Sequence, residues 1–349
     1  MEKSAAMSHN RTEEQPMEQV RPRLFVSRCL GFAKCRWNGE VINDDFVSKL
    51  EPMADIVHEC PEMAIGLGCP RDPVRVVRAG DRYELLQPAT GNTYGLIMER
   101  WAEDYLGALE RSPERLDGFI LKSRSPSCGF KDVKVYDSLR PDSGSKPGTG
   151  IFGAAVLRHY PGTPIEDEGR LKNFIIREHF LGAVWTLARF RAAKQKGSMK
   201  ALVEFHATHK YFLLLHNQKE MRILGTIVAN HEKLPLQEVL QRYEQGLRRA
   251  LARPPRYTSL INVIQHAFGS FSDSLSKEER ALFANLVEQY RDERIPASVL
   301  LHLVKSWAVR FGEAYLLQQV LFEPYPLSLI EITDSGKGRS KKGSDPFSF

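Results

Sequence analysis

The first part of the chain alternates short apolar runs with amphipathic segments. Runs rich in β-branched and apolar residues, bounded by turn residues, predict strands at 23–27, 55–59, 74–79, 83–87, 118–122 and 133–136. Apolar residues spaced three or four apart predict helices at 44–53, 93–110 and 149–159, and the Gly, Ser and Pro content of 143–150 predicts a loop. Strands that alternate with helices favour an α/β layered sheet of the Rossmann-like kind.

From residue 172 onward the pattern is helical throughout. Its periodicity predicts helices at 172–196, 200–216, 218–230, 236–251, 257–271, 276–291 and 296–320. Ser276 and Glu279 have the spacing of a capping box at a helix start. We therefore expect an α/β domain at 21–160, a linker at 161–171 and an all-α domain at 172–326. The polar segments 1–20 and 327–349 are predicted to be a disordered leader and a disordered tail.

Composition narrows the class of protein. Hydrophobic residues make up 42% of the chain and charged residues 26%, which is typical of a soluble globular protein. The sequence contains no apolar stretch of about 18 residues and no apolar leader of the secretory kind. We therefore expect a cytoplasmic protein with no membrane partner, whose five cysteines remain reduced.

Charge is distributed unevenly along the chain. Residues 1–171 hold 23 Lys and Arg against 26 Asp and Glu, whereas residues 172–326 hold 22 against 14. The basic second half favours a polyanion such as RNA as partner, although a solvated basic face would give the same count. Acidic residues are absent from 188–203 and from 245–272. The candidate RNA contacts in these stretches are Arg189, Arg191, Arg248, Arg249, Arg253 and Arg256, with Tyr257 as a candidate for base stacking.

Three of the five cysteines follow predicted strands. Cys29 comes after 23–27, Cys60 directly after 55–59, and Cys128 after 118–122. Loops that follow strands of a parallel sheet gather at one edge, so these thiols can converge there. The chain has no Cys-x-x-Cys, and three soft thiolates suit an iron–sulfur cluster better than zinc. Ordinary buried thiols are the alternative interpretation.

The segments around these cysteines resemble the TudS family of thiouracil desulfidases over about residues 22–160. They are Ser27-Arg28-Cys29-Leu30, Cys60-Pro61-Glu62 with a Gly-rich turn ending in Cys69-Pro70-Arg71, and Ser125-Pro126-Ser127-Cys128-Gly129. The second half resembles the helical YbgA-like domain that is fused to this family in RudS-type proteins, which act on 4-thiouridine in tRNA. Its marks include Phe205-His206-Ala207 and Pro324-Tyr325-Pro326.

The resemblance implies a desulfidase that converts 4-thiouridine in tRNA to uridine and releases sulfide. It implies that Cys29, Cys60 and Cys128 hold a [4Fe–4S] cluster with one open iron, and that Glu62 and Ser125 move protons. Because the reaction is hydrolytic, neither a nicotinamide nor an electron donor is expected.

Several alternatives stay open. Arg71 is a candidate for a substrate phosphate or, equally, for a surface ion pair. Cys35 and Cys69 stand where many family members have other residues, so either one could lie near the cluster. The substrate could also be free thiouracil or a thiouridine nucleotide. The chain could also be a non-catalytic protein that binds RNA or senses redox state through its cluster.

Overall fold

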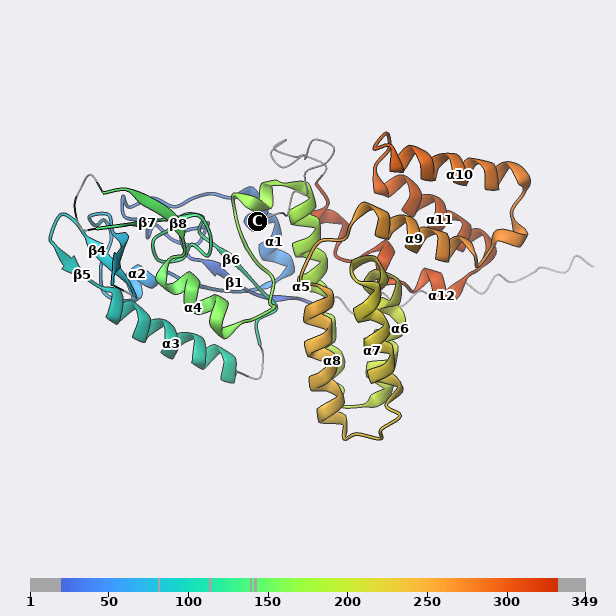
Figure 1. Ribbon diagram of the computed structural model, residues 1–349, viewed down its shortest axis with the longest axis horizontal. Coiled ribbons are helices and arrows are strands. Elements are labelled where there is room, and N and C mark those ends of the chain that lie inside the picture. Colours follow the sequence, from blue (N-terminus) through green and yellow to red (C-terminus); the bar gives the residue numbers. More distant parts are fainter. Residues whose placement is uncertain (1–19, 81, 113–114, 139, 141–142, 332–349) are drawn as a thin grey trace, which may run out of the picture.

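The computed structural model describes residues 20–331, apart from residues 81, 113–114, 139 and 141–142. An α/β part is followed by an all-helical part, as the sequence predicts (Figure 1). The predicted disordered leader and most of the predicted tail lie outside the described residues.

A four-stranded parallel sheet forms the centre of the α/β part. Its strands lie in the order β2 (Asp55–Glu59), β1 (Arg23–Ser27), β6 (Gly118–Leu121) and β9 (Ile165–Asp167). Their carboxyl ends therefore meet at one edge. The prediction of a linker at 161–171 is wrong in part, because residues 165–167 form β9, a strand of this sheet. The strand is short and acidic, so it carries no apolar run that periodicity could detect.

A second sheet lies beside the first and completes this part. Its order is β5 (Asn92–Thr93), β4 (Arg82–Gln87), β3 (Arg75–Ala79), β7 (Val133–Tyr136) and β8 (Ser145–Gly148). Only β3 and β7 pair in parallel. The loop predicted at 143–150 is wrong, because β8 is an edge strand. An exposed edge position tolerates Pro147, which hid the strand from sequence analysis.

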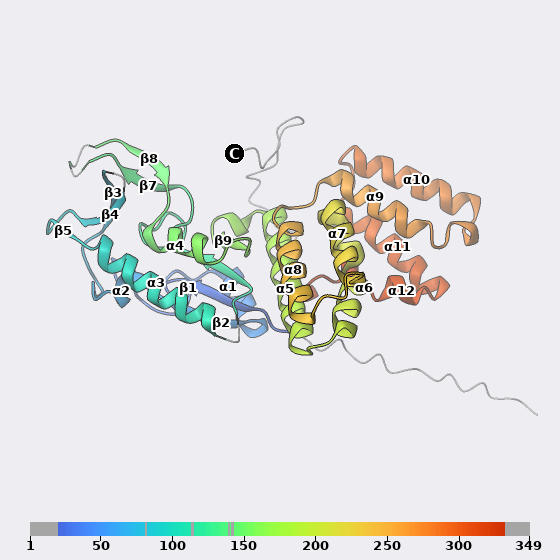
Figure 2. The same ribbon diagram turned by 60° about the horizontal axis from the view of Figure 1, so that its bottom comes forward.

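Helices α3 (Gly95–Arg111) and α4 (Ile151–His159) cover one face of the parallel sheet, and the short helix α2 (Pro61–Ala64) directly follows β2 at its carboxyl edge. Helices α3 and α4 lie side by side (Figure 2), and the ring of Phe152 in α4 lies 5.4 Å from the ring of Phe25 in β1. The same core takes in Phe119 and apolar residues of the second sheet, so both sheets share it.

The opposite face of the parallel sheet is covered by α1 (Asp45–Leu50) and by α5 (Phe174–Gln195), the first long helix after the sheet. Phe180, Leu181 and Val184 pack with Leu24 and Ile120 of the strands. A Cβ atom at Gly118 would lie only 2.6 Å from Val184 Cγ1, so the helix touches β6 directly.

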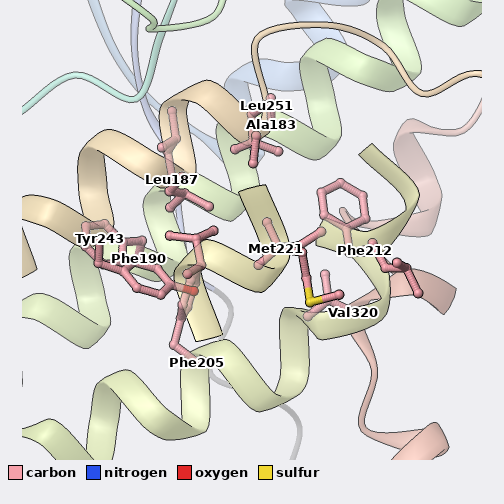
Figure 3. Close-up of a cluster of buried hydrophobic side chains, with 14 of the residues drawn as sticks. Ala183, Leu187, Phe190, Phe205, Phe212, Met221, Tyr243, Leu251 and Val320 are labelled. Atoms are coloured by element: carbon pink, nitrogen blue, oxygen red, sulfur yellow. The ribbon is translucent and has the colours of Figure 1, made fainter. Parts of the chain in front are cut away.

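Another side of α5 belongs to the core of the helical part. Ala183, Leu187 and Phe190 pack there, and Phe190 stacks 5.4 Å from Tyr243 (Figure 3). Residues 180–188 of the helix are all buried, as expected for a segment that packs between two cores.

The remaining helices form two further layers. They are α6 (Met199–His216), α7 (Gln218–Ala229), α8 (Leu236–Ala250), α9 (Tyr257–Phe268), α10 (Lys277–Arg291), α11 (Ala297–Phe311) and α12 (Ala314–Leu317). The predicted capping box of Ser276 and Glu279 is confirmed. The single helix predicted at 296–320 is wrong, because α11 ends where Gly312 adopts a left-handed φ of 67°.

Polar contacts and residues 327–331 join the α/β part to the helical part. Arg191 Nη2 lies 2.8 Å from Asp117 Oδ2, and Arg248 Nη1 donates to Thr163 Oγ1 at 2.6 Å. The tail prediction is wrong for its first residues, since Leu329 is buried against the α/β part and Arg177 Nη2 donates to the Glu331 carbonyl. Within the described residues, no helix has both the length and the apolar character needed to span a bilayer.

The packing of α5 on the sheet gives a stability prediction. Phe180→Ala is expected to lower the free energy of unfolding by about 3–5 kcal/mol, because it leaves a cavity in a fully buried core. Ile175→Ala, at an exposed position of the same helix, should change it by about 0.5 kcal/mol or less. Denaturant unfolding followed by circular dichroism measures both. Equal losses in the two variants would contradict this account of α5.

Candidate active site

Four thiols meet at the carboxyl edge of the parallel sheet. Cys29 lies two residues after β1, Cys60 directly follows β2 as the N-cap of α2, and Cys128 lies in the loop after β6. All three are buried, as is Cys35. The carboxyl ends of parallel strands account for this convergence, as the order of strand and cysteine in the sequence predicts.

Cys35 lies among the predicted ligands. Its thiol is hydrogen-bonded to that of Cys29, which raises the pKa of Cys35 to about 11, and it also reaches Cys60. The hydrogen bond with Cys35, together with burial, raises the pKa of Cys60 as well. Cys69 lies outside this group. Its Sγ is partly exposed and lies 3.1 Å from the Lys34 carbonyl.

Glu62 approaches the same edge from the first turn of α2. Its Oε1 accepts a hydrogen bond of 2.9 Å from Ser127 Oγ, and its Oε2 accepts one of 2.8 Å from Arg71 Nε and another from Arg71 Nη2. The carboxylate and the guanidinium are both buried. A buried charge needs such a partner, so each side chain holds the other in place.

Arg71 is committed to groups of the protein. Besides its ion pair with Glu62, its Nη1 donates to the carbonyls of Gly68 at 2.7 Å and Cys35 at 3.1 Å. Its side chain is 4% exposed. The structure thus places Arg71 in a buried pair, and its donors do not face solvent, where a substrate phosphate would arrive.

The two serines before Cys128 have different contacts. Ser125 Oγ accepts hydrogen bonds from the backbone N–H groups of Ser127 and Cys128, at 3.2 and 3.1 Å, and thereby fixes the turn. The hydroxyls of Ser125 and Ser27 also reach the Cys128 thiol, whose pKa is raised chiefly by burial. Sequence analysis selected Ser125 for proton transfer and missed Ser127, which contacts Glu62. The sequence signal that could have identified Ser127 is its position directly before Cys128 in the motif Ser125-Pro126-Ser127-Cys128-Gly129.

Small residues let α4 hold the Cys128 loop. Gly150 N–H donates to the Gly129 carbonyl at 2.7 Å, and Gly153 N–H donates to the Ser127 carbonyl at 3.0 Å. A Cβ atom at Gly153 would lie 2.3 Å from the Gly129 oxygen, so a side chain there would displace the loop. The start of α4 therefore fixes the position of the third predicted ligand.

A polar group that sequence analysis missed lies at the ends of β6 and β9. Lys122 Nζ pairs with Glu168 and donates to Ser123 Oγ at 2.8 Å. Glu168 also accepts from the Ser123 N–H at 2.9 Å, while Lys122 N–H donates to Ser27 Oγ at 2.9 Å. Because Ser27 precedes Cys29 by two residues, this polar group stabilises the edge of the parallel sheet at which the cysteines lie. Sequence analysis missed Glu168 because the residue lies in the segment that was predicted to be a linker.

Four of the seven residues predicted to contact RNA have partners within the protein. Arg189 Nη1 donates to the Pro324 carbonyl at 2.7 Å, and burial lowers its pKa to about 10. Arg191 and Arg248 join the two parts of the chain, as described above. Arg249 pairs with Glu220 at 3.1 Å.

The other three lie at the turn between α8 and α9, which we call the arginine turn (residues 253–257). Arg253 and Arg256 are exposed, and Tyr257 is 57% exposed. Neither arginine forms an ion pair within the described part of the chain. The arginine turn thus presents two cations and an aromatic ring to solvent.

The donor chemistry of the thiols fits an iron–sulfur cluster. The cysteines at the edge are free, buried and soft, and sheet and helix hold their loops from both sides. Among the described residues, no three His, Cys, Asp or Glu side chains are arranged around a single metal ion. In a cubane cluster each thiolate binds a different iron, so its ligands need not share one centre.

Comparisons with known proteins match the two parts of the chain to two separate families. The family described as 2-thiouracil desulfurase matches residues 24–168, and the one described as a protein of unknown function, DUF1722, matches 210–326. The chain is 33% identical to the uncharacterized protein YbbK of Bacillus subtilis (strain 168) over 160 residues. These residues are 44% of this chain and 99% of YbbK.

Two further proteins complete the comparison. The uncharacterized protein YbgA of Escherichia coli (strain K12) is 29% identical over 155 residues, which are 44% of this chain and 91% of YbgA. A solved structure described as the [4Fe-4S]-dependent thiouracil desulfidase TudS is 28% identical. It covers 43% of this chain and 93% of its own, with a TM-score of 0.35.

Proposed function

Because the chain belongs to the 2-thiouracil desulfurase family, with a DUF1722 domain following, we propose that it removes sulfur from a thiolated uracil base as sulfide. The observation that carries this proposal is the pairing of Glu62 with Ser127, the residue next to Cys128. It sets a buried carboxylate beside soft thiols at one edge of the sheet.

Cys29, Cys60 and Cys128 are the residues that would hold a [4Fe–4S] cluster and leave one iron open to the substrate. When bound, the cluster would supply a thiophilic Lewis acid for the sulfur of the base. Replacement of C=S by C=O consumes one water and releases one hydrogen sulfide. No electrons are exchanged, so neither a nicotinamide nor an electron donor is required.

In this proposal, Glu62 would accept the proton of that water. Oε2 accepts two hydrogen bonds from Arg71, whereas Oε1 accepts one from Ser127 and keeps a further lone pair. A base within reach of the attacking water typically contributes about 100–10,000-fold to the rate. Arg71 would neutralise and orient the carboxylate, and Ser127 would tie it to the Cys128 loop. Ser125 would set the turn and could supply a second proton.

For the substrate we propose 4-thiouridine within tRNA. The support is the basic character of residues 172–326 and the exposed arginine turn. A thiolated base must leave its stack to enter a buried site, and unstacking costs a few kcal/mol. Contacts to the phosphate backbone can offset that cost while they hold the RNA in register.

One assay tests the reaction and the substrate together. The protein is purified without air, its iron and sulfide are measured, and tRNA and 4-thiouridine monophosphate are compared by loss of the near-ultraviolet absorption of the thiolated base. We expect a brown protein that acts on tRNA. Action on the mononucleotide alone would remove the RNA part of the proposal. A cluster-loaded protein that is inactive on both would favour sensing or RNA binding, and a colourless zinc protein would contradict the cluster.

The arginine turn gives a separate prediction. Arg253→Ala/Arg256→Ala should weaken tRNA binding and make the slope of log K against log salt shallower by about 0.7–0.9 per lost phosphate contact. Activity on 4-thiouridine monophosphate should persist. The matched control is Arg291→Ala/Arg294→Ala, which removes equal charge from arginines already paired with Glu288 and Asp292. Equal effects of the two double variants on tRNA binding would exclude a specific role for the turn.

A further inference from the structure

A positively charged side chain reaches solvent from the loop that carries Cys128. Arg124 lies three residues after β6, at the carboxyl edge of the parallel sheet, and it is exposed. Among the residues that the structure describes, it forms no hydrogen bond through its side chain and no ion pair. In parallel α/β sheets, ligands bind outside the carboxyl ends of the strands. Arg124 is therefore an unpaired cation on the side from which a substrate would approach.

The backbone of Arg124 has an unusual conformation. Its φ of 56° lies in the left-handed region, which residues other than glycine rarely adopt. The Ser125 N–H donates to the Lys122 carbonyl at 3.4 Å and closes a turn in which Arg124 is the third residue. Glycine or asparagine usually occupies a left-handed position at this place in a turn. Because glycine would serve the fold with less strain, a long charged side chain here indicates a function.

Both neighbours of Arg124 are held in place. Ser123 donates to Glu168 through its N–H at 2.9 Å and through its hydroxyl at 2.6 Å. On the other side, Ser125 Oγ accepts a hydrogen bond of 3.1 Å from the Cys128 N–H. The backbone of Arg124 thus has a fixed position relative to Cys128, so the guanidinium can meet a ligand without movement of the loop.

Other cations at this edge already have partners. Arg71 and Lys122 each pair with a glutamate of the protein. Glu168, which binds the neighbouring Ser123, is neutralised by Lys122 and leaves Arg124 without a counter-charge. An unpaired guanidinium offers five N–H donors in a planar fork, and this fork matches the oxygens of a phosphate group.

We propose that Arg124 binds the phosphate attached to the ribose of the thiolated base, and so makes the site selective for a nucleotide over the free base. The inference rests on the proposed function, because it presupposes that a thiolated uracil reaches the cysteine edge. It gives the role for which Arg71 was a candidate to a residue that is open to solvent. A mononucleotide and the backbone of tRNA share this phosphate chemistry, so both are tested.

The experiment compares 4-thiouracil, 4-thiouridine monophosphate and tRNA that contains 4-thiouridine as substrates of the anaerobically purified, cluster-loaded full chain. Arg124→Gly removes the cation and suits the left-handed backbone, so the turn should stay intact. It should raise KM for the monophosphate by about 10-fold or more, the scale of a charged hydrogen bond, and leave the kinetics on 4-thiouracil unchanged. Arg124→Lys, which keeps the charge without the fork, should have an intermediate KM.

Binding is measured separately from turnover. Titration calorimetry compares uridine monophosphate, the product, with uridine, and Arg124→Gly should weaken binding of the first by a similar factor and leave that of the second unchanged. The matched control is Lys233→Gly, which also removes an exposed cation at a left-handed φ, here 54°, but in the loop between α7 and α8. This variant should leave KM for the monophosphate unchanged.

The outcomes separate the inference from the proposed function. Loss on tRNA as well as on the monophosphate would assign Arg124 to a phosphodiester of the RNA, and loss on the monophosphate alone would assign it to a terminal phosphate. An unchanged KM in Arg124→Gly would overturn the inference and leave the proposed function intact. An equal loss on 4-thiouracil, or in Lys233→Gly, would overturn it too, because the effect would then come from the loop or from net charge. Wild-type protein inactive on all three substrates would contradict the proposed function, while the calorimetry would still decide the role of Arg124.

Discussion

Alanine at Cys29, Cys60 or Cys128 is expected to leave the purified protein without a stable cluster and without desulfidase activity. Two remaining protein ligands hold such a cluster only weakly, because each lost thiolate opens another iron to solvent. Iron and sulfide per protein after anaerobic reconstitution, followed by the desulfidation assay, measure the effect.

The control for the cysteine variants is Cys69→Ala, which should keep both its cluster and its activity because its Sγ lies against the backbone carbonyls of Lys34 and Arg36 in the neighbouring loop. A Cys128→Ala protein with a full complement of iron would disprove the ligand assignment. Loss of the cluster in Cys69→Ala together with its retention in Cys60→Ala would exchange the roles of these two residues.

Glu62→Gln is expected to keep the cluster and to lose activity by about 100-fold or more, the usual scale for a positioned acid–base group. Glutamine can still accept the hydrogen bond from Ser127, but it cannot take a proton from water as a carboxylate does. It also leaves the Arg71 guanidinium without its buried counter-charge. Breaking a buried pair can cost about 3–5 kcal/mol, so thermal unfolding has to be measured beside the rate.

Two outcomes of the Glu62→Gln experiment separate chemistry from structure. Loss of activity with unchanged iron content and only a moderate fall in Tm assigns Glu62 to proton transfer. Full activity would reduce Glu62 to the structural partner of Arg71. Ser127→Ala, which removes the hydroxyl that orients the carboxylate, should lower activity less than Glu62→Gln does.

Local signals in the sequence predicted much of the fold and the position of the cysteines. Strands β1, β2 and β7 and most helices agree with their predicted ranges, because each carries its own apolar period. The acidic strand β9 and the edge strand β8 carry no such period, since partner strands rather than their own side chains hold them in place. The division into two sheets likewise depends on strand pairing, which no local pattern encodes.

For the site, too, sequence analysis succeeded where the signal is local and failed where contacts join distant parts of the chain. The order of strand and cysteine placed Cys29, Cys60 and Cys128 at one edge, because that rule depends only on the direction of the chain. The choice of Ser127 over Ser125 as the partner of Glu62 depends on contacts across 65 positions of sequence. The burial of Arg71 and the inward position of Cys35 depend on such contacts too, so sequence left both residues with two possible roles.

The position of α5 has a consequence for recombination between such proteins. YbbK and YbgA each match about one half of the chain, and the desulfurase match ends at residue 168, shortly before α5 begins. The point at which the sequences are joined is therefore not a boundary between independent folding units, because the segment after it supplies part of the cover for one face of the sheet before it. A chimera that joins the α/β part of one protein to the helical part of another would have to match the foreign α5 to the strands it covers, beginning with Val184 against Gly118.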